Sequence, residues 1–340
     1  MKKSLVIINN EKCIKISDKI FCQNIEMKTM PEALNSHFNV KLILRKSKVV
    51  PIHEIELNNT NLSSNIFGFI FSILKEFNNN NSKYLIVAIT PYTFAAYLLL
   101  ALTKKKIFLY LRSNGLFEYK LILGSHFVWI YRFMLHIMSK KSTILCVSDR
   151  ILKGSNYKLV SPSQLNQKWL ENINEASPKE IKLLYIGRIK IEKGIFSLLN
   201  LYKKINLKLP HTLTLVGHGK KIQNLEDNVK ILDPVSKTDE LIKIYDFHNI
   251  TILPSFTEGH PQILLESLAR MRPVIIFDEI DFVKKDYHGV FVSKRDSHNL
   301  EKIIMYITEN YHEIYQLMKK NILPSKEIFI QEIVEALNGQ

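Results

Sequence analysis

"NITILPSFTEGHPQILLESLARMRPVIIF", residues 249–277, encodes a strand, a turn, a helix and a second strand in direct succession. The apolar run 249–255 ends at a polar turn. Residues 261–271 then repeat their apolar side chains at helical spacing, and 272–277 is a second apolar run. Two short apolar runs joined by an amphipathic helix predict parallel strands with a crossover helix.

The same alternation continues on both sides of this stretch. In the second half we predict further strands at 181–187, 211–217, 228–232 and 289–293, and helices at 194–205 and 238–247. In the first half the predicted strands are 4–8, 39–44, 84–90, 106–111 and 142–148. This pattern predicts an α/β protein with two Rossmann-like, doubly wound parallel sheets.

A chain of 340 residues is long enough for two domains at about 100–200 residues each. We predict a basic N-terminal domain (1–165) and a linker (166–180) within the polar stretch 161–180, which has a proline near each end. A C-terminal ligand-binding domain (181–312) and C-terminal helices (313–340) follow, and these helices could cross back to the first domain.

The net charge of +15 belongs entirely to the first half of the chain. Residues 1–170 hold 24 Lys and Arg against 9 Asp and Glu, whereas 171–340 hold 23 of each kind. A basic half suits an anionic membrane surface or a nucleic acid. A lysine-rich compositional habit would have raised the second half as well.

Two apolar segments of the first half bear on membranes. Residues 84–102 are nearly long enough to span a bilayer, but Pro91 lies where a strand-to-helix turn would place it, so we predict a buried strand and a helix. Residues 125–141 read as an amphipathic helix that ends at Lys140 and Lys141. This helix is either half-buried in the first domain or docked on anionic lipid.

The opening residues are too short an apolar run for a signal peptide, and the three cysteines show no pairing or CxxC spacing. A reducing compartment is therefore expected, and a structural zinc site is not. The histidines form no metal set by spacing, and "DEID" (278–281) has the wrong spacing for a D-x-D triplet. We expect neither a metal nor a cofactor.

In "YIGRIKIEKG" (185–194) a strand ends at Gly187, and two cations, Arg188 and Lys193, precede a helix start. Cations beside a helix N-terminus favour an anion, most naturally a phosphate, although a solvated basic loop gives the same pattern. In "VGHGKK" (216–221) Gly217 and Gly219 allow a ligand close to the backbone, but a lone GxG is a weak signal.

The turn within 254–266 carries two glutamates. Pro261 suits the first helical position, so Gly259 and His260 form the turn and aim free N–H groups at the strand end. Glu258 precedes the helix, and Glu266 lies about one and a half turns into it. Two carboxylates for hydroxyl groups, with an anion site between them, predict a nucleotide sugar as ligand.

Three motifs in this order resemble the C-terminal domain of the family-four retaining glycosyltransferases of GT-B fold, also described as glycosyl transferases group 1. They are "LLYIGRIKIEKGIFSLL", "LTLVGHGKKI" and "ILPSFTEGHPQILLESLARMRPVI". The resemblance covers residues 181–310 well, and 1–160 only in strand order and the "LCVSD" element. It implies two Rossmann-like domains that face a central cleft, and metal-independent transfer that retains the anomeric configuration.

The resemblance also implies roles for single residues. Arg188 and Lys193 would bind the donor diphosphate, Glu258 the transferred sugar and Glu266 the nucleotide ribose. The other implied donor-binding positions are Gly187, Gly217, Gly219, Gly259, His260, Pro261 and Gln262. His260 stands where the family more often has a smaller residue or an aromatic one, so its role is open.

The first half departs from the family pattern. It lacks the glycine-rich loop after the first strand, and Arg112 stands where the family has a histidine. Arg112, Asn114 and Glu118 are candidates for contact with the acceptor or the donor. A polar loop without function would account for them equally well.

Together these inferences predict a bacterial, cytoplasmic glycosyltransferase, peripheral on the inner face of the plasma membrane. It would extend a surface polysaccharide or a lipid-linked oligosaccharide, such as O-antigen, lipopolysaccharide or capsule. A nucleotide-sugar 2-epimerase or a phosphorylase on the same fold is the alternative. A nucleic-acid-binding protein is a distant third, because no RNA- or DNA-recognition motif accompanies the charge.

Overall fold

A computed structural model describes residues 2–77, 81–113, 115–152, 157–219, 222–223 and 225–339. The chain divides into unit 1, Met1–Pro162 with Lys326–Gln340, and unit 2, Ser163–Ser325. The chain thus leaves unit 1 after Pro162 and returns to it after Ser325, whereas the sequence placed a linker at 166–180 and the terminal helices at 313–340. Each unit contains its own sheet and its own hydrophobic core.

Unit 1 is built on a parallel sheet that runs β5-β3-β1-β6-β7-β8-β9. The end of β1 also joins β2 and β4 in an antiparallel ribbon. The elements of unit 1 are β1 (Ser4–Ile16), β2 (Lys19–Cys22), α1 (Glu26–Leu34), β3 (Asn39–Lys46), β4 (His53–Ile55), β5 (Thr60–Ser63), α2 (Ile66–Leu74), β6 (Lys83–Val87), α3 (Pro91–Ala101), β7 (Lys106–Leu111), α4 (Gly115–Leu123), η1 (Ser125–Phe127), α5 (Val128–Ser139), β8 (Ser142–Cys146), β9 (Tyr157–Leu159) and α11 (Lys326–Asn338).

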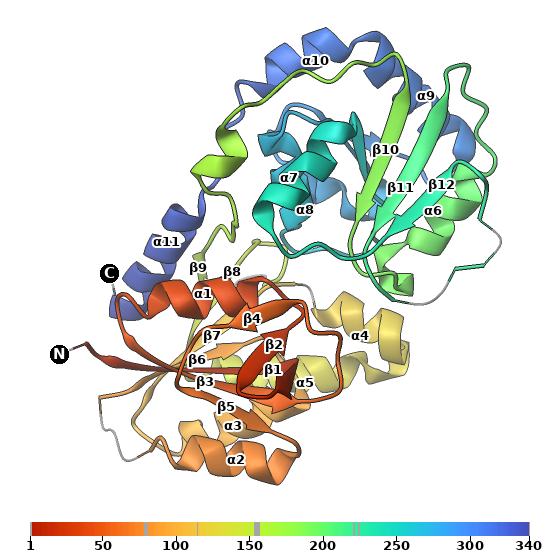
Figure 1. The fold of residues 1–340 in the computed structure, drawn as a ribbon. Coiled ribbons are helices and arrows are strands. Elements are labelled where there is room, and N and C mark those ends of the chain that lie inside the picture. The colour runs from red at the N-terminus through yellow and green to blue at the C-terminus, as the bar shows by residue number, and fades with distance from the viewer. Residues whose placement is uncertain are drawn as a thin grey trace. The chain divides into compact units, whose positions relative to one another are not determined.

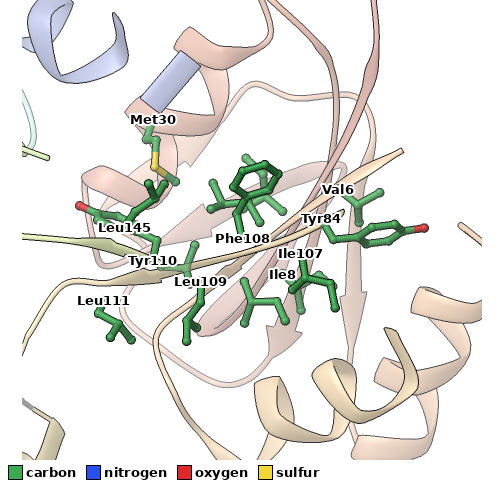
Figure 2. Close-up of a cluster of buried hydrophobic side chains, with 14 of the residues drawn as sticks. Val6, Ile8, Met30, Tyr84, Ile107, Phe108, Leu109, Tyr110, Leu111 and Leu145 are labelled. Atoms are coloured by element: carbon green, nitrogen blue, oxygen red, sulfur yellow. The ribbon is translucent and has the colours of Figure 1, made fainter. Parts of the chain in front are cut away.

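The core of unit 1 lies along its central strands. β6 is buried throughout and β7 almost throughout, as expected of strands with helices on both faces. Figure 2 shows this packing, with Tyr84 and Tyr110 at opposite ends of the cluster. The C-terminal helix α11 packs beside α1 (Figure 1).

The apolar stretch 84–102 forms β6 and α3, as predicted, and α3 begins at Pro91. Thr90 caps this helix: its hydroxyl accepts from the backbone N–H of Thr93, whose own hydroxyl accepts from the N–H of Thr90. A reciprocal cap of this kind stabilises a helix by about 1 kcal/mol. None of the helices in the described part of the chain is long and apolar enough to cross a bilayer.

Unit 2 is a parallel sheet of order β12-β11-β10-β13-β14-β15. Its elements are η2 (Gln167–Leu170), β10 (Ile181–Ile186), η3 (Ile191–Lys193), α6 (Ile195–Tyr202), β11 (His211–Val216), β12 (Val229–Leu232), α7 (Thr238–Phe247), β13 (Ile250–Leu253), α8 (Gln262–Ala269), β14 (Val274–Phe277), η4 (Asp278–Lys284), β15 (Val290–Ser293), α9 (Ser297–Glu309) and α10 (Tyr311–Met318). The strand order reverses between β10 and β13. In such sheets ligands bind at the carboxyl ends of the strands beside this reversal.

Two buried arginines fasten residues 169–174 to the rest of unit 2. Arg270 pairs with Asp246 through two hydrogen bonds of 2.9 and 2.8 Å, and donates to the carbonyls of Trp169 and Glu171. Arg272 donates to the carbonyl of Asn174. The planar guanidinium group suits this role, because it satisfies several acceptors while staying buried.

The prediction of an α/β fold with two doubly wound parallel sheets is confirmed. The predicted strands of both halves appear in the expected order. The sequence did not indicate β2, β4, β5 and β9, which are short strands with mostly incomplete burial.

Candidate functional site

Two loops meet where the strand order of unit 2 reverses. The first follows β10 and runs from Gly187 to η3, and the second follows β13 and runs from Pro254 to α8. The backbone N–H of Phe256 donates to the carbonyl of Glu192 at 3.1 Å and so joins the two loops. Gly194 takes a left-handed conformation, with φ of 68°, and approaches the carbonyl oxygen of Pro254 closely.

The two loops bring Lys193 and Glu258 into direct contact. Lys193 Nζ lies 2.6 Å from Glu258 Oε1, and the same oxygen accepts a hydrogen bond of 2.6 Å from the hydroxyl of Ser255. The two side chains are 23% and 10% exposed, which leaves the ammonium group accessible while the carboxylate is held in place. Ser255 is fully buried and fixes one oxygen of the carboxylate.

Arg188 lies on the same loop as Lys193, and its side chain is exposed. Its carbonyl accepts a hydrogen bond of 2.8 Å from the hydroxyl of Tyr185, which fixes the backbone at this point. Burial, followed by the charges of Arg188 and Lys190, lowers the pKa of His218 on the neighbouring loop. The loops after β10 and β11 therefore gather positive charge, while His218 itself is favoured in its neutral form.

The glycines of these loops pack backbone against backbone. A Cβ atom at Gly217 would meet the carbonyl oxygen of Gly187 at 1.9 Å, and one at Gly219 would meet that of Ile189 at 2.2 Å. Residues 189 and 219 also form an isolated parallel bridge. We predicted that Gly217 and Gly219 allow close approach by a ligand; in the structure, the close approach of the two loops already requires glycine at both positions.

Glu266 lies deeper in unit 2 than Glu258. Its side chain is buried, and Oε2 accepts a hydrogen bond of 2.9 Å from the hydroxyl of Tyr245 on α7. Burial raises the pKa of Glu266 to about 7, although the bond from Tyr245 opposes this shift. Among the described residues this is the one hydrogen bond to the Glu266 carboxylate, which therefore retains acceptor capacity for ligand hydroxyl groups.

The turn between the two glutamates leads directly into α8. Pro261 is the N-cap residue and α8 begins at Gln262, one residue later than predicted. The side chain of Gln262 accepts from the backbone N–H of Gln164 at 3.0 Å. His260 Nε2 is buried and has no hydrogen-bond partner among the described residues. Burial and the charge of Lys285 lower the pKa of His260 to about 3, so its imidazole is neutral.

The candidates of unit 1 lie apart in the sequence from this constellation. Arg112 follows β7 and pairs with Glu26 at 3.8 Å. Glu118 lies in the first turn of α4, and its charge acts on Arg112. Asn114 lies outside the described residues. Within the described ranges there is no group of three or more His, Cys, Asp or Glu side chains that could hold a metal ion.

We did not predict from the sequence that Tyr245, Ser255 and Arg295 belong to this site. Arg295 donates to the carbonyl of Pro254 at 3.0 Å, pairs with Glu279 and lies over the ring of Phe256. Arg295 lies between β15 and α9, and it therefore holds the loop that carries Glu258 from the far side of β14. The serine directly after the strand could have been noticed, but no sequence signal connects Arg295 to residues some forty positions before it.

Replacing Glu266 by glutamine is expected to stabilise the ligand-free protein above pH 7. Because its folded pKa of about 7 exceeds the ordinary value of 4.5, wild-type stability falls as the pH rises from 4.5 through 7. Ionised and buried, Glu266 costs on the order of 3 kcal/mol. Urea unfolding at pH 4.5 and 8 should show a gain for Glu266→Gln only at pH 8.

Glu279→Gln is the matched control for this pH dependence. The hydrogen bond and charge of Arg295 outweigh burial and lower the pKa of Glu279, so its removal should cost stability at pH 8. A gain for Glu266→Gln of equal size at both pH values would show that the gain does not come from ionisation of the carboxyl, and would contradict the raised pKa of Glu266.

Parts of this chain resemble known proteins in sequence, and the chain resembles solved structures in fold. Residues 167–323 match the family model described as "Glycosyl transferases group 1". An uncharacterised glycosyltransferase of Haemophilus influenzae is 26% identical over 168 residues, which is 46% of this chain and 48% of that protein. The chain matches about half the length of such curated relatives.

A second relative is named for a specific reaction. The Campylobacter jejuni "GalNAc-alpha-(1->4)-GalNAc-alpha-(1->3)-diNAcBac-PP-undecaprenol alpha-1,4-N-acetyl-D-galactosaminyltransferase" is 26% identical over 167 residues, 46% of either chain. Among solved structures, sucrose-phosphate synthase of Thermosynechococcus elongatus superposes with a TM-score of 0.74 at 15% identity, over 99% of both chains. Anabaena HepE with UDP and glucose has a TM-score of 0.70 at 11% identity, over 99% of this chain and all of that one. The family model and the names of these curated relatives are those of glycosyltransferases, and the two solved structures share the fold of this chain.

Proposed function

We propose that this chain is a retaining glycosyltransferase of family four, which transfers a sugar from a nucleotide-diphosphate donor to a saccharide or lipid-linked saccharide. The contact between Lys193 and Glu258 beside the start of α8 carries the proposal. One group offers a positive charge to a diphosphate and the other accepts from sugar hydroxyls, at the strand ends where ligands bind in such sheets.

Each side chain has a task in the proposed reaction. Lys193, Arg188 and the N-terminal end of α8 stabilise the negative charge that collects on the leaving diphosphate when the sugar–phosphate bond breaks. Glu258 orients the transferred sugar, and Glu266 accepts from the ribose hydroxyls. A leaving phosphate oxygen takes the proton of the acceptor hydroxyl. These groups perform the reaction without a metal ion or a cofactor.

Thermal unfolding with UDP, GDP, ADP and CMP tests the donor site. We expect one nucleoside diphosphate to raise the melting temperature, because a ligand at 100 times its dissociation constant stabilises a protein by about 2.7 kcal/mol. The gain should shrink in Lys193→Ala. If none of the four nucleotides changes the melting temperature of the wild type, the proposal is wrong.

We further propose that the acceptor is extended at the inner face of an anionic membrane. The excess positive charge of the first half supports this, and so do large apolar side chains exposed on η1 and α5, namely Phe127, Trp129 and Phe133. α4, which contacts α5, exposes Phe117, Ile122 and Leu123. Exposed basic side chains of the same helix, Arg132 within α5 and Lys140 at its C-terminal end, attract anionic lipid at about 1 kcal/mol each.

Sedimentation with vesicles distinguishes lipid binding at this surface from nonspecific adsorption. The wild type should bind phosphatidylglycerol vesicles and should not bind phosphatidylcholine vesicles. Trp129→Ser should weaken the binding to phosphatidylglycerol several-fold. Phe247→Ser is the control, since Phe247 in unit 2 is exposed to the same extent, 65%. Equal losses in both variants would contradict a surface on α5.

A further inference from the structure

Arg295 lies in the loop between β15 and α9, and its side chain is only 16% exposed. Its guanidinium group forms two hydrogen bonds with the carboxylate of Glu279, of 2.7 and 2.9 Å. The same group lies over two aromatic rings, at 4.2 Å from the centroid of Phe256 and 4.3 Å from that of Phe277. A guanidinium group suits this place, because its edge pairs with a carboxylate while its faces stack on rings.

Arg295 also joins three segments at the carboxyl edge of the sheet in unit 2. Its Nη2 donates to the carbonyl of Pro254 after β13 at 3.0 Å, and its Nη1 donates to the hydroxyl of Ser197 in α6 at 3.4 Å. Glu279 belongs to η4, which follows β14. These hydrogen bonds use four of the five N–H donors of a guanidinium group, so Arg295 is placed to hold protein segments together and not to bind a phosphate.

The contacts of Arg295 lead to the proposed donor site through Ser255. Arg295 holds the carbonyl of Pro254 on one side of this serine and covers the ring of Phe256 on the other. The hydroxyl of Ser255 donates to Glu258 Oε1 at 2.6 Å and so fixes the carboxylate. Arg295 therefore supports the backbone on both sides of the side chain that orients Glu258, as precise sites require of the residues around them.

Loss of this support should affect the sugar of the donor more than its nucleotide. In the function proposed above, Glu258 orients the transferred sugar and Glu266 accepts from the ribose. Glu266 is held by Tyr245 on α7, a hydrogen bond that does not involve the loop after β13. The cationic loop stays joined to its neighbour by the bond from the N–H of Phe256 to the carbonyl of Glu192. The nucleotide contacts should therefore persist when the position of Glu258 is loosened.

We propose that Arg295 is a positioning residue for sugar transfer, which sets the orientation of Glu258 through Ser255. The proposal rests on the function proposed above and adds a residue that touches neither the sugar nor the diphosphate of the donor. Arg295→Lys is the variant that tests it. Lysine keeps the positive charge but has no planar fork, so it cannot pair twice with Glu279 while it donates to Pro254.

Isothermal titration of the full chain with UDP, GDP, UDP-glucose, UDP-N-acetylglucosamine and GDP-mannose compares each nucleotide sugar with its own nucleoside diphosphate. For the nucleotide sugar that the wild type binds most tightly, Arg295→Lys should raise the dissociation constant about tenfold. The dissociation constant of the matching nucleoside diphosphate should stay within about threefold. Ser255→Ala removes the next link and should produce the same split. Because both residues act along one path, the double variant should lose no more affinity than the weaker-binding single variant.

Arg270→Lys is the matched control. Arg270 also belongs to unit 2 and forms two hydrogen bonds with one carboxylate, that of Asp246, but it fastens residues 169–174. Its substitution should lower the melting temperature at least as much as Arg295→Lys does, because Arg270 is almost fully buried. The ratio between the dissociation constants of the nucleotide sugar and the nucleoside diphosphate should stay at its wild-type value.

The inference alone is overturned if Arg295→Lys weakens the nucleotide sugar and the nucleoside diphosphate to the same extent, as a merely structural residue would. Wild-type affinity for both ligands in Arg295→Lys would overturn it as well. Losses that multiply in the double variant would show that Arg295 does not act through Ser255. If the wild type binds none of the five ligands, the function proposed above is wrong and the inference falls with it.

Discussion

Lys193→Ala is expected to lower sugar transfer by about 10²–10³-fold while the protein remains folded. The ammonium group is held 2.6 Å from Glu258 at the strand ends beside α8, so it is already in place when negative charge develops on the diphosphate. Preorganised charges of this kind are the largest single contribution to many enzymatic rates. Initial rates with saturating donor, and melting curves of the same preparations, provide the measurement.

Lys203→Ala is the matched control. Lys203 belongs to the same unit and pairs with Glu226 at 3.0 Å, but its side chain is 70% exposed and it lies at the far end of α6. Its removal should leave the rate within a factor of two, since exposed ion pairs contribute about 0–1 kcal/mol. Wild-type activity in Lys193→Ala, or an equal loss in Lys203→Ala, would contradict the role of Lys193.

Glu258→Gln extends this test. The amide retains the shape that Ser255 holds in place but loses the charge that pairs with Lys193. If the two side chains act on the same transition state, the rate loss of the double variant should be smaller than the product of the single losses. Independent, multiplicative losses would show that the two residues act separately.

Incubation of the wild type with donor alone distinguishes transfer from epimerisation, because an epimerase would produce an isomer of the donor.

The strands of unit 2 could be predicted from the sequence because both faces of a parallel sheet are covered. Such strands form continuous apolar runs, and in unit 1 the predicted strand 106–111 coincides with β7 for the same reason. The strand β5, with the sequence TNLS, has no such run. Among the strands that the structure describes, β5 lies at the edge of the sheet and pairs with β3 alone, so its residues need not be apolar.

The site was predictable where it depends on strand order and not where it depends on packing between helices. Lys193 and Glu258 each follow a strand, and these strands are neighbours in a doubly wound sheet, so their approach follows from topology. The bond from Tyr245 to Glu266 joins α7 to α8 and requires a particular rotation of both helices. The pair of Glu26 and Arg112 likewise unites segments far apart in sequence.

Gly194→Ala is expected to destabilise the protein by roughly 2–5 kcal/mol and to abolish nucleotide binding. The residue has φ of 68°, and an added Cβ would lie 1.8 Å from the carbonyl oxygen of Pro254. This neighbour is backbone, and Arg295 donates to the same oxygen, so the loop cannot yield without displacing residues 255–258. Urea unfolding and the nucleotide-dependent change in melting temperature measure the two effects.

Gly289→Ala separates the clash from the backbone strain. Gly289 also has positive φ, 82°, but an added Cβ would meet Cγ and Sδ of the Met318 side chain at 2.5 Å, and a methionine side chain can shift to another rotamer where a backbone carbonyl cannot. Its loss should be close to the cost of a left-handed alanine alone, about 1–2 kcal/mol, and nucleotide binding should persist. If the two variants lose equal stability and both bind nucleotide, the contact between the Gly194 loop and Pro254 does not hold Lys193 beside Glu258, and the donor site must be assembled in another way.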